Sequence, residues 1–468
     1  MSLVSHAMQT KSKMKRLRVL VGITTLNCMI TGVVPIARAD DAASSLSPLE
    51  QRLNALEEEV RSLKKEIALE KKADVGKTNE VPVVAASKDG FALKSGDGNF
   101  QLRLGGYVQT DGRFYFHDKA HSFSDTFLIR RARPVFEATV YKDFTLRLMP
   151  DFGNGSTVLY DAYVDWKHWS WLGLRVGKFK PPIGLERLQN DPDQLFAETA
   201  LPTALVPTRD IGAQLGGNLF GGAVNYAVGI FNGAVDGSST TDIDTGDSKD
   251  AAARIFLQPL KNTNIEPLRK LGVGMAGSYG NQQIAGTSTN LPTFKTPGQQ
   301  TFFSYRSTAF PNGERTRLAP QGYYYWGPFG LLGEYTISGQ RVALGTTSET
   351  LRDRAWQVAA SFLLTGDDAS YTGVNPKHPF DLKTGQWGAW EIVGRYHVLE
   401  VDRDTFPAFA NPATAASKAT AWGVGLNWYL SRNVRADLDY EQTAFNGGAT
   451  VGTRPTEEIV FTRLQLRY

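Results

Sequence analysis

Apolar and polar side chains alternate along most of the chain, from about residue 91 to the C-terminus. In the closing segment E-I-V-F-T-R-L-Q-L-R-Y (458–468), residues such as Leu464 share one face, while Arg463 and Arg467 share the other. A period of two residues is the pattern of a β-strand. Strands with one apolar face toward lipid and one polar face toward water are typical of a transmembrane β-barrel.

Sixteen segments with this alternation follow one another. They predict an all-β fold, a 16-stranded antiparallel transmembrane β-barrel. The segments lie near 101–116, 127–141, 143–152, 157–167, 172–179, 210–219, 222–231, 250–258, 271–280, 314–326, 329–342, 350–364, 386–401, 419–430, 433–444 and 458–468.

The lengths of the connections support an alternating up-and-down order. With a periplasmic N-terminus, the connections near 142, 168–171, 220, 327–328 and 431–432 are short, and those at 180–209, 232–249, 281–313, 402–418 and 445–457 are long. Short periplasmic turns and long external loops are typical of outer-membrane barrels. Two connections on the short side differ: 259–270 is moderate, and 365–385 is long. The second either packs under the barrel or indicates a misplaced hairpin.

The third external loop, residues 180–209, is unusually apolar and rich in proline. Its leucines and Phe196 need a surface to pack against. We therefore expect this loop to fold inward against the barrel wall and to narrow the channel.

A secretory signal peptide is predicted for residues 1–39. A basic run precedes an apolar stretch from Val19 to about Val34, and the sequence Ala37-Arg38-Ala39 has the A-x-A form of a cleavage site. The stretch lacks the roughly 20 uninterrupted apolar residues of a membrane helix. The signal peptide predicts that the protein is exported from the cytoplasm.

Residues 40–70 carry a second pattern. Leu49, Leu53, Leu56, Val60, Leu63 and Ile67 are spaced alternately by three and four residues, which is three heptads of a coiled coil. This predicts self-association, and a homotrimer would suit a barrel; the alternative is a helix docked on its own chain. Residues 71–90 have neither period and are expected to be a linker to the barrel domain, 91–468.

Charge and cysteine content narrow the function. Without residues 1–39 the chain has 45 basic and 47 acidic residues, a formal net charge of −2, which gives no reason to expect nucleic acid as a partner. The single cysteine, Cys28, lies in the leader, so thiolate chemistry is excluded from the mature chain. No motif indicates an enzyme, a metal site or a cofactor.

Arginines recur on the face expected to line the lumen. A guanidinium stays charged and offers a planar set of donors to an anion such as phosphate. A row of moderately attractive sites would let anions pass. The alternative is that these arginines pair with inward acids (Asp111, Glu137, Asp151, Asp161, Asp165, Asp437 and Asp439) and hold the wall together. The inward arginines are Arg103, Arg113, Arg131, Arg133, Arg147, Arg175, Arg254, Arg463 and Arg467.

Several motifs in this order resemble the phosphate-selective porin O/P family. They are V-G-K-F-K-P-P-I-G-L-E-R-L (176–188), L-P-T-A-L-V-P-T-R-D-I-G (201–212), F-L-I-R-R-A-R-P-V-F-E (127–137), D-F-G-N-G (151–155) and D-A-Y-V-D (161–165). The resemblance implies a trimeric 16-stranded channel of Gram-negative outer membranes, with the third loop bent into an arginine-lined lumen and phosphate or polyphosphate as the preferred solute.

The resemblance also implies roles for single residues. Arg113, the pair Arg130 and Arg131, and Arg187 match basic pore positions, and Asp161 matches an acidic partner at the constriction. Phosphate-specific members have an arginine after the later glutamate of the loop, whereas Thr199 follows Glu198 here. The basic residues in and beside the loop, Lys178, Lys180, Arg187 and Arg209, are balanced by Glu186, Asp191, Asp193, Glu198 and Asp210.

These observations predict a water-filled outer-membrane channel for passive diffusion of small inorganic anions, surrounded by outer-membrane lipid. The alternatives are a general or weakly selective porin, and a structural envelope barrel tethered by its coiled coil.

Overall fold

A computed structural model describes residues 52–67, 69, 82–87, 90–117, 123–243, 247–283 and 290–468. The chain divides into two compact units, Met1–Asp74 and Val75–Tyr468. The signal peptide prediction lies outside the described residues.

In the first unit, residues 52–67 form an α-helix. Its apolar side chains Leu53, Leu56, Val60, Leu63 and Ile67 are all exposed in the single chain. Among the described residues, no helix has the length and hydropathy needed to cross a bilayer. The coiled coil stays a prediction, because its seam needs partners from other helices.

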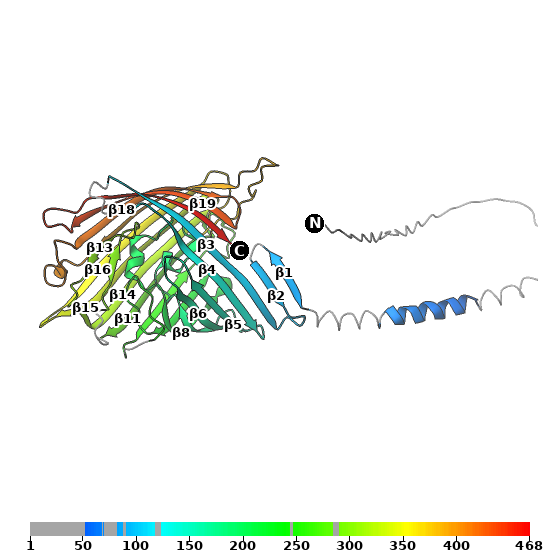
Figure 1. The fold of residues 1–468 in the computed structure, drawn as a ribbon. Helices are drawn as coiled ribbons and strands as arrows, with labels where there is room; N and C mark the ends of the chain where they lie inside the picture. The colour runs from blue at the N-terminus through cyan, green and yellow to red at the C-terminus, as the bar shows by residue number, and fades with distance from the viewer. Residues whose placement is uncertain are drawn as a thin grey trace, which may run out of the picture. The chain divides into compact units, whose positions relative to one another are not determined.

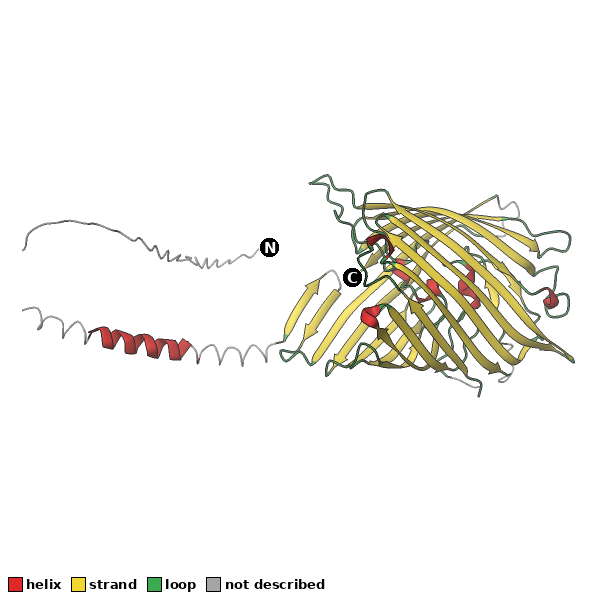
Figure 2. Cartoon of the chain, turned by 180° about the vertical axis from the view of Figure 1, so that it is seen from behind, coloured by secondary structure: helices red, strands yellow, loops and turns green. Residues whose placement is uncertain are grey.

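The second unit is a closed antiparallel barrel of sixteen strands, as the sequence predicted (Figures 1 and 2). Every predicted segment corresponds to one strand. The barrel strands are β3 (Phe100–Phe116), β4 (Thr126–Val140), β5 (Phe144–Asp151), β6 (Val158–Trp166), β7 (Gly173–Phe179), β8 (Asp210–Leu219), β9 (Val224–Phe231), β10 (Asp250–Leu257), β11 (Leu271–Gln282), β14 (Phe310–Trp326), β15 (Phe329–Leu344), β16 (Thr347–Leu363), β17 (Ala389–Glu400), β18 (Ala416–Tyr429), β19 (Val434–Gly447) and β20 (Glu457–Arg467).

The first and last strands close the barrel. β20 pairs with β3 from Glu458 opposite Phe116 to Arg467 opposite Tyr107. The start of β3 extends past this seam, and β2 (Gly90–Lys94) pairs with it from Phe91 opposite Leu104. β1 (Val83–Ser87) pairs with β2. The structure differs here from the predicted linker, because five residues without alternating polarity form a strand by pairing with a neighbour.

Side chains alternate between the two faces of the wall, as β16 illustrates. Asp353 and Gln357 are buried on the inside, whereas Arg354, Trp356 and Val358 are exposed on the outside. This separation is the expected one for a barrel with an apolar outer band and a polar lumen.

Loop L3, residues 180–209, lies against the inner wall. It contains the short helical segments α2 (Leu185–Leu188), η1 (Asp191–Asp193) and η2 (Leu201–Leu205). Its backbone bonds to inward side chains of distant strands: Leu185 N–H donates to Glu334 of β15 at 2.6 Å, and Ala197 N–H donates to Asp439 of β19 at 2.8 Å. Hydrogen bonds to wall carboxylates satisfy backbone N–H groups of L3. Burying these groups without a partner would cost free energy.

Turn T6, residues 364–388, also enters the barrel, from the end that carries the short turns. The Tyr371 hydroxyl donates to the carbonyl oxygen of Leu185 at 2.6 Å, and the Gln189 side chain donates to the carbonyl oxygen of Tyr371 at 2.7 Å. The Tyr371 ring stacks on Tyr323 with 5.1 Å between ring centroids. T6 therefore joins two strands and also supports L3, which explains its length.

A further β-hairpin, β12 (Thr293–Lys295) with β13 (Thr301–Ser304), lies in the long β11–β14 connection. Gln299, between its strands, donates to Glu198 of L3 at 3.4 Å. The short helices η3 (Phe220–Gly222), η4 (Glu266–Leu268) and η5 (Arg403–Thr405) lie in other connections.

Candidate channel and its lining

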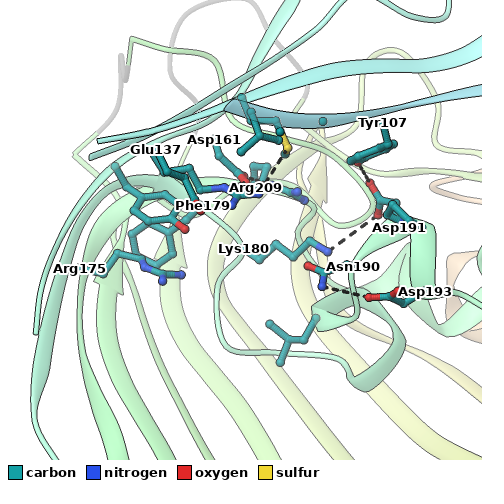
Figure 3. Close-up of a pocket in the computed structure, with 18 of the residues that line it drawn as sticks. Tyr107, Glu137, Asp161, Arg175, Phe179, Lys180, Asn190, Asp191, Asp193 and Arg209 are labelled. Carbon is teal, nitrogen blue, oxygen red and sulfur yellow. Dashed lines mark hydrogen bonds and ion pairs between the residues drawn. The ribbon is translucent and has the colours of Figure 1, made fainter. Parts of the chain in front are cut away.

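A cavity of about 570 Å³ remains between L3 and the wall. Figure 3 shows Lys180, Asn190, Asp191 and Asp193 of L3 beside wall residues that include Glu137, Asp161 and Arg175. Seven basic side chains and four acidic ones line it. The basic ones are Arg103, Arg147, Arg175, Lys180, Arg209, Arg254 and Arg467; the acidic ones are Glu137, Asp161, Asp191 and Asp193.

Asp161 is the centre of one group of charges in this cavity. It accepts from Arg209 Nε at 2.6 Å and lies 3.4 Å from Arg147 Nε. Arg147 also donates to Glu137 at 2.6 Å, and Arg103 lies 3.8 Å from Glu137. Three arginines thus share two carboxylates, which leaves a net positive charge.

Arg175 and Arg254 differ in whether a carboxylate balances the charge of the guanidinium. Arg175 donates twice to Asp165, at 2.6 and 2.8 Å. Arg254 contacts only neutral oxygens, Asn225 Oδ1 at 3.0 Å and Gln321 Oε1 at 3.4 Å, and its guanidinium lies 4.6 Å from the Phe256 ring centroid. Among the described residues, no carboxylate forms an ion pair with Arg254, so its charge is available to a solute.

Lys180 begins L3 within the cavity. Its ammonium donates to the carbonyl oxygen of Gln189 at 2.6 Å and lies 3.9 Å from Asp191. Burial, together with the positive charges of Arg209 and Arg187, lowers the pKa of Lys180 to about 7, although Asp191 opposes this. We therefore expect the charge of this cavity to depend on pH near neutrality.

A second group of charges surrounds Glu198 of L3. Glu198 accepts from Arg113 at 2.8 Å and from Arg130 at 2.5 and 3.0 Å. Arg130 and Arg131 are consecutive, yet both side chains contact L3, because the β3–β4 register shifts at this point. A β-bulge of this kind lets neighbouring residues point to one side of a sheet.

Asp191 of L3 gathers a third group. Arg133 forms an ion pair with it, Tyr107 donates to it at 2.9 Å, and Arg131 lies 3.6 Å away. Burial alone would raise the pKa of Asp191, but these guanidinium groups hold it well below its usual range. Arg133 also donates to Asp151 at 2.7 Å.

The arginines of the closing strand are also paired. Arg463 donates twice to Asp111, at 2.7 Å each. Arg467 forms an ion pair with Asp193 of L3 and lines the cavity. For most single arginines, the structure therefore shows the pairing that the sequence left as an alternative.

Seven of the fourteen expected positions are not among the residues that line this cavity: Arg113, Arg130, Arg131, Arg133, Lys178, Arg187 and Arg463. Lys178 is buried, and its ammonium pairs at 2.7 Å with exposed Asp242. A pore-lining role for Lys178 stays a prediction. Arg187 donates to the carbonyl oxygen of Thr203 at 2.8 Å within L3, also outside the cavity lining.

The sequence analysis missed four inward arginines. Arg315 and Arg317 of β14 bind Asp250 at 2.7 and 2.9 Å. Arg395 of β17 and Arg435 of β19 donate to the carbonyl oxygens of Glu198 and Gln194, both at 2.7 Å. The alternation that identified the other arginines also applies to these strands and could have found all four.

Charge is distributed unevenly around the lumen. Strands β15 to β19 carry the inward acids Glu334, Glu391, Asp437, Asp439 and Glu441, and L3 packs on this side through contacts with Glu334 and Asp439. The open cavity borders the arginines of β3 to β10. L3 thus contacts both acidic and basic side chains of the wall, and the arginines that border the opening belong mainly to the first half of the barrel.

A closed barrel with a polar lumen and a loop folded into it is the architecture of a porin. Residues 100–468 match the sequence profile of the family described as phosphate-selective porin O and P, and the chain belongs to this family. It is therefore an outer-membrane protein of the Gram-negative type, as the sequence predicted.

Known relatives agree with this assignment. Porin O of Pseudomonas aeruginosa is 24% identical over 395 residues, which cover 78% of this chain and 87% of the relative. The outer-membrane channel DcaP of Acinetobacter baumannii has a TM-score of 0.53 at 12% identity, covering 82% of this chain and 99% of that one. An anion-selective porin from Comamonas acidovorans has a TM-score of 0.50 at 11% identity, covering 79% and 100%. At these identities the two structures establish the fold.

Proposed function

We propose that this porin passes small inorganic anions by passive diffusion along the basic side of its lumen, with phosphate or polyphosphate as the favoured solutes. The excess of basic over acidic side chains around the cavity carries the proposal. Membership of the phosphate-selective porin O and P family supports it.

Several arginines that line the cavity are only partly neutralised by neighbouring carboxylates. An anion passing Arg103 and Arg147 meets guanidinium groups that already share Glu137 and Asp161, so the attraction is moderate. Moderate sites favour flux, because a deep well would hold the anion. Arg254 is the exception among the described lining residues, and we propose it as the strongest anion contact.

One observation favours weak selectivity as a second candidate. Glu198 forms ion pairs with Arg113 and Arg130, two of the arginines that the family resemblance matches to basic pore positions. This carboxylate offsets one of the two positive charges, and Thr199 adds none, so the cluster offers a phosphate less charge than the two arginines alone would.

Planar-bilayer recordings test the proposal. In a KCl gradient, the reversal potential should show chloride to be more permeant than potassium, and added phosphate should reduce the chloride current. A cation preference would contradict the proposal, and an absence of steady conductance would favour a structural barrel. Anion preference without block by phosphate would favour the weakly selective alternative.

We also propose that the chain assembles as a homotrimer through the helix at residues 52–67. Its exposed seam, Leu53 to Ile67, supports this. Replacing Leu56 and Val60 by aspartate should weaken the oligomer measured by mass photometry; an unchanged mass would contradict a role for the helix.

A further inference from the structure

The outer face of the barrel carries an exposed basic cluster at the end with the long loops. Arg352 and Arg354 of β16 are exposed and alternate with buried Leu351, Asp353 and Ala355. They therefore point away from the lumen, on the same face as Trp356.

Arg341 of β15 belongs to the same cluster. It is exposed and lies opposite Thr350, one outward position from Arg352. Its Nε donates to Ser348 Oγ at 3.2 Å. Gly339 stands opposite Arg352, so no side chain from β15 covers that guanidinium at this position.

Two carboxylates near this cluster, Glu400 and Asp402, are already engaged. Glu400, opposite Arg354, accepts from Lys418 at 2.6 Å. Asp402 accepts the backbone N–H groups of Arg352 at 2.7 Å and Asp404 at 3.1 Å. In the part of the chain that the structure describes, no hydrogen bond or ion pair holds the guanidinium of Arg352 or Arg354.

The cluster lies at the level expected for lipid headgroups. Below Arg354 on the outer face, the Trp356 and Tyr396 rings lie 5.5 Å apart, and the Trp422 and Tyr440 rings also lie 5.5 Å apart. Aromatic girdles mark the interface between the lipid core and the headgroups in such barrels. Arginines just beyond a girdle are placed to meet headgroup charges.

The rest of this rim differs in charge. Glu458 of β20 is held by His117 at 2.6 Å, and Glu314 accepts from the Tyr279 hydroxyl at 3.1 Å. Arg341, Arg352 and Arg354 lie together on the two neighbouring strands β15 and β16.

From these observations we propose that Arg341, Arg352 and Arg354 form a binding site for the phosphate groups of an outer-leaflet glycolipid. Two guanidinium groups on one strand face are separated by two residues, about 7 Å. They can each direct a planar pair of donors to one phosphorylated headgroup while the acyl chains lie on the apolar band below.

Equilibrium binding of the full-length chain in detergent to mixed micelles that contain lipid A tests the site. The variant Arg352→Gln with Arg354→Gln should bind about tenfold more weakly or worse, because it loses charge-assisted contacts to phosphate. The matched control, Lys142→Gln with Lys261→Gln, removes two exposed charges from the opposite rim and should bind like the wild type.

Two comparisons identify the ligand chemistry. Lipid A without its phosphates should bind the wild type as weakly as lipid A binds the double variant, and free inorganic phosphate at the same concentration should not compete. Equal lipid A affinity for wild type and double variant, or equal affinity for the phosphate-free lipid, would overturn the proposal. Resistance of the barrel to unfolding in SDS shows whether each variant folds. If the double variant does not fold, the single variants Arg352→Gln and Arg354→Gln are measured instead.

The channel provides an independent readout. Because these arginines face away from the lumen, the double variant should keep the wild-type single-channel conductance. Loss of lipid binding is thereby separable from failure of the proposed channel function.

Discussion

Glu198 of L3 accepts two hydrogen bonds from the guanidinium of Arg130, at 2.5 and 3.0 Å, across the β-bulge that turns Arg130 inward. Burial alone would raise the pKa of Glu198, but the guanidinium groups of Arg130, Arg131 and Arg113 hold it well below its usual range. The carboxylate stays ionised at any pH used for channel recordings. It therefore offsets one of the positive charges that an entering anion would meet.

Replacing Glu198 by glutamine should strengthen anion binding. Arg113 and Arg130 lose their carboxylate, so phosphate should block the chloride current at roughly tenfold lower concentration, the effect of one charge-assisted contact. Block by phosphate in planar bilayers measures this. Glu266→Gln removes the same charge from an exposed turn and should change nothing. Unchanged block in Glu198→Gln would argue against a solute contact by these arginines.

Replacing Thr199 by arginine should create or deepen a phosphate site. Thr199 is half-buried beside the Glu198 cluster and accepts from the Thr203 hydroxyl at 2.8 Å. A guanidinium there adds a planar donor pair where phosphate-specific relatives are expected to have one. The measurement is again block of chloride current; Thr199→Gln, which adds length without charge, is the control. Equal block by both variants would contradict a role for the charge.

The chloride preference should fall between pH 6 and pH 8. With its pKa lowered to about 7, Lys180 carries its charge below that pH and loses it above. Reversal potentials at the two pH values measure the change. Lys180→Arg should abolish the pH dependence because its charge persists, and Lys180→Gln should resemble the wild type at pH 8. A pH dependence that survives in Lys180→Arg would assign it to another group.

Loss of Arg254 should lower the chloride preference without distorting the wall. No described carboxylate pairs with Arg254, so Arg254→Gln leaves no uncompensated acid behind. The ratio of chloride to potassium permeability should decrease, while thermal stability stays close to that of the wild type. Arg269→Gln, in the β10–β11 connection, is the control. An unchanged ratio would exclude Arg254 as an anion contact.

Weakening the contact between T6 and L3 should make the open channel noisier. Tyr371→Phe removes the hydrogen bond to the Leu185 carbonyl, which contributes about 1 kcal/mol. Gly373→Val should act more strongly, because Gly373 has φ of +87° and an added Cβ would lie 2.4 Å from Asp193 Oδ1. Single-channel current noise measures both.

Ser370→Ala provides the matched control for T6. Its hydroxyl contacts Thr372 within the same turn and does not reach L3. Quiet currents in both Tyr371→Phe and Gly373→Val would show that L3 keeps its position without T6.

Most of the fold could be predicted from local patterns. Alternation over β3 to β20 specifies which side chains face lipid, because the period of a strand is two. A shift of one residue would turn the polar face toward the lipid, which is unfavourable. The same parity assigned Arg103, Arg147 and Arg175 to the lumen, where the structure has them lining the cavity.

Contacts between distant segments could not be predicted in this way. The sequence shows that L3 needs a packing surface and that residues 365–385 are too long for a turn. Only the folded barrel brings Tyr371 to Leu185, and Glu198 to Arg113 and Arg130. Their partners lie 68 to 186 positions away. No local period specifies such pairs, because they depend on barrel closure and on the direction in which each loop leaves its strand.

The sequence therefore determined a membrane barrel, its strand order and an inner wall rich in arginine, since each follows from alternation repeated along the chain. Tertiary structure decided which of those charges stay available. Asp111 holds Arg463 and Glu198 holds Arg130, whereas Arg254 meets only neutral oxygens. The physical reason is that selectivity depends on the net charge that remains after ion pairs form. These ion pairs join residues that only the folded barrel brings together.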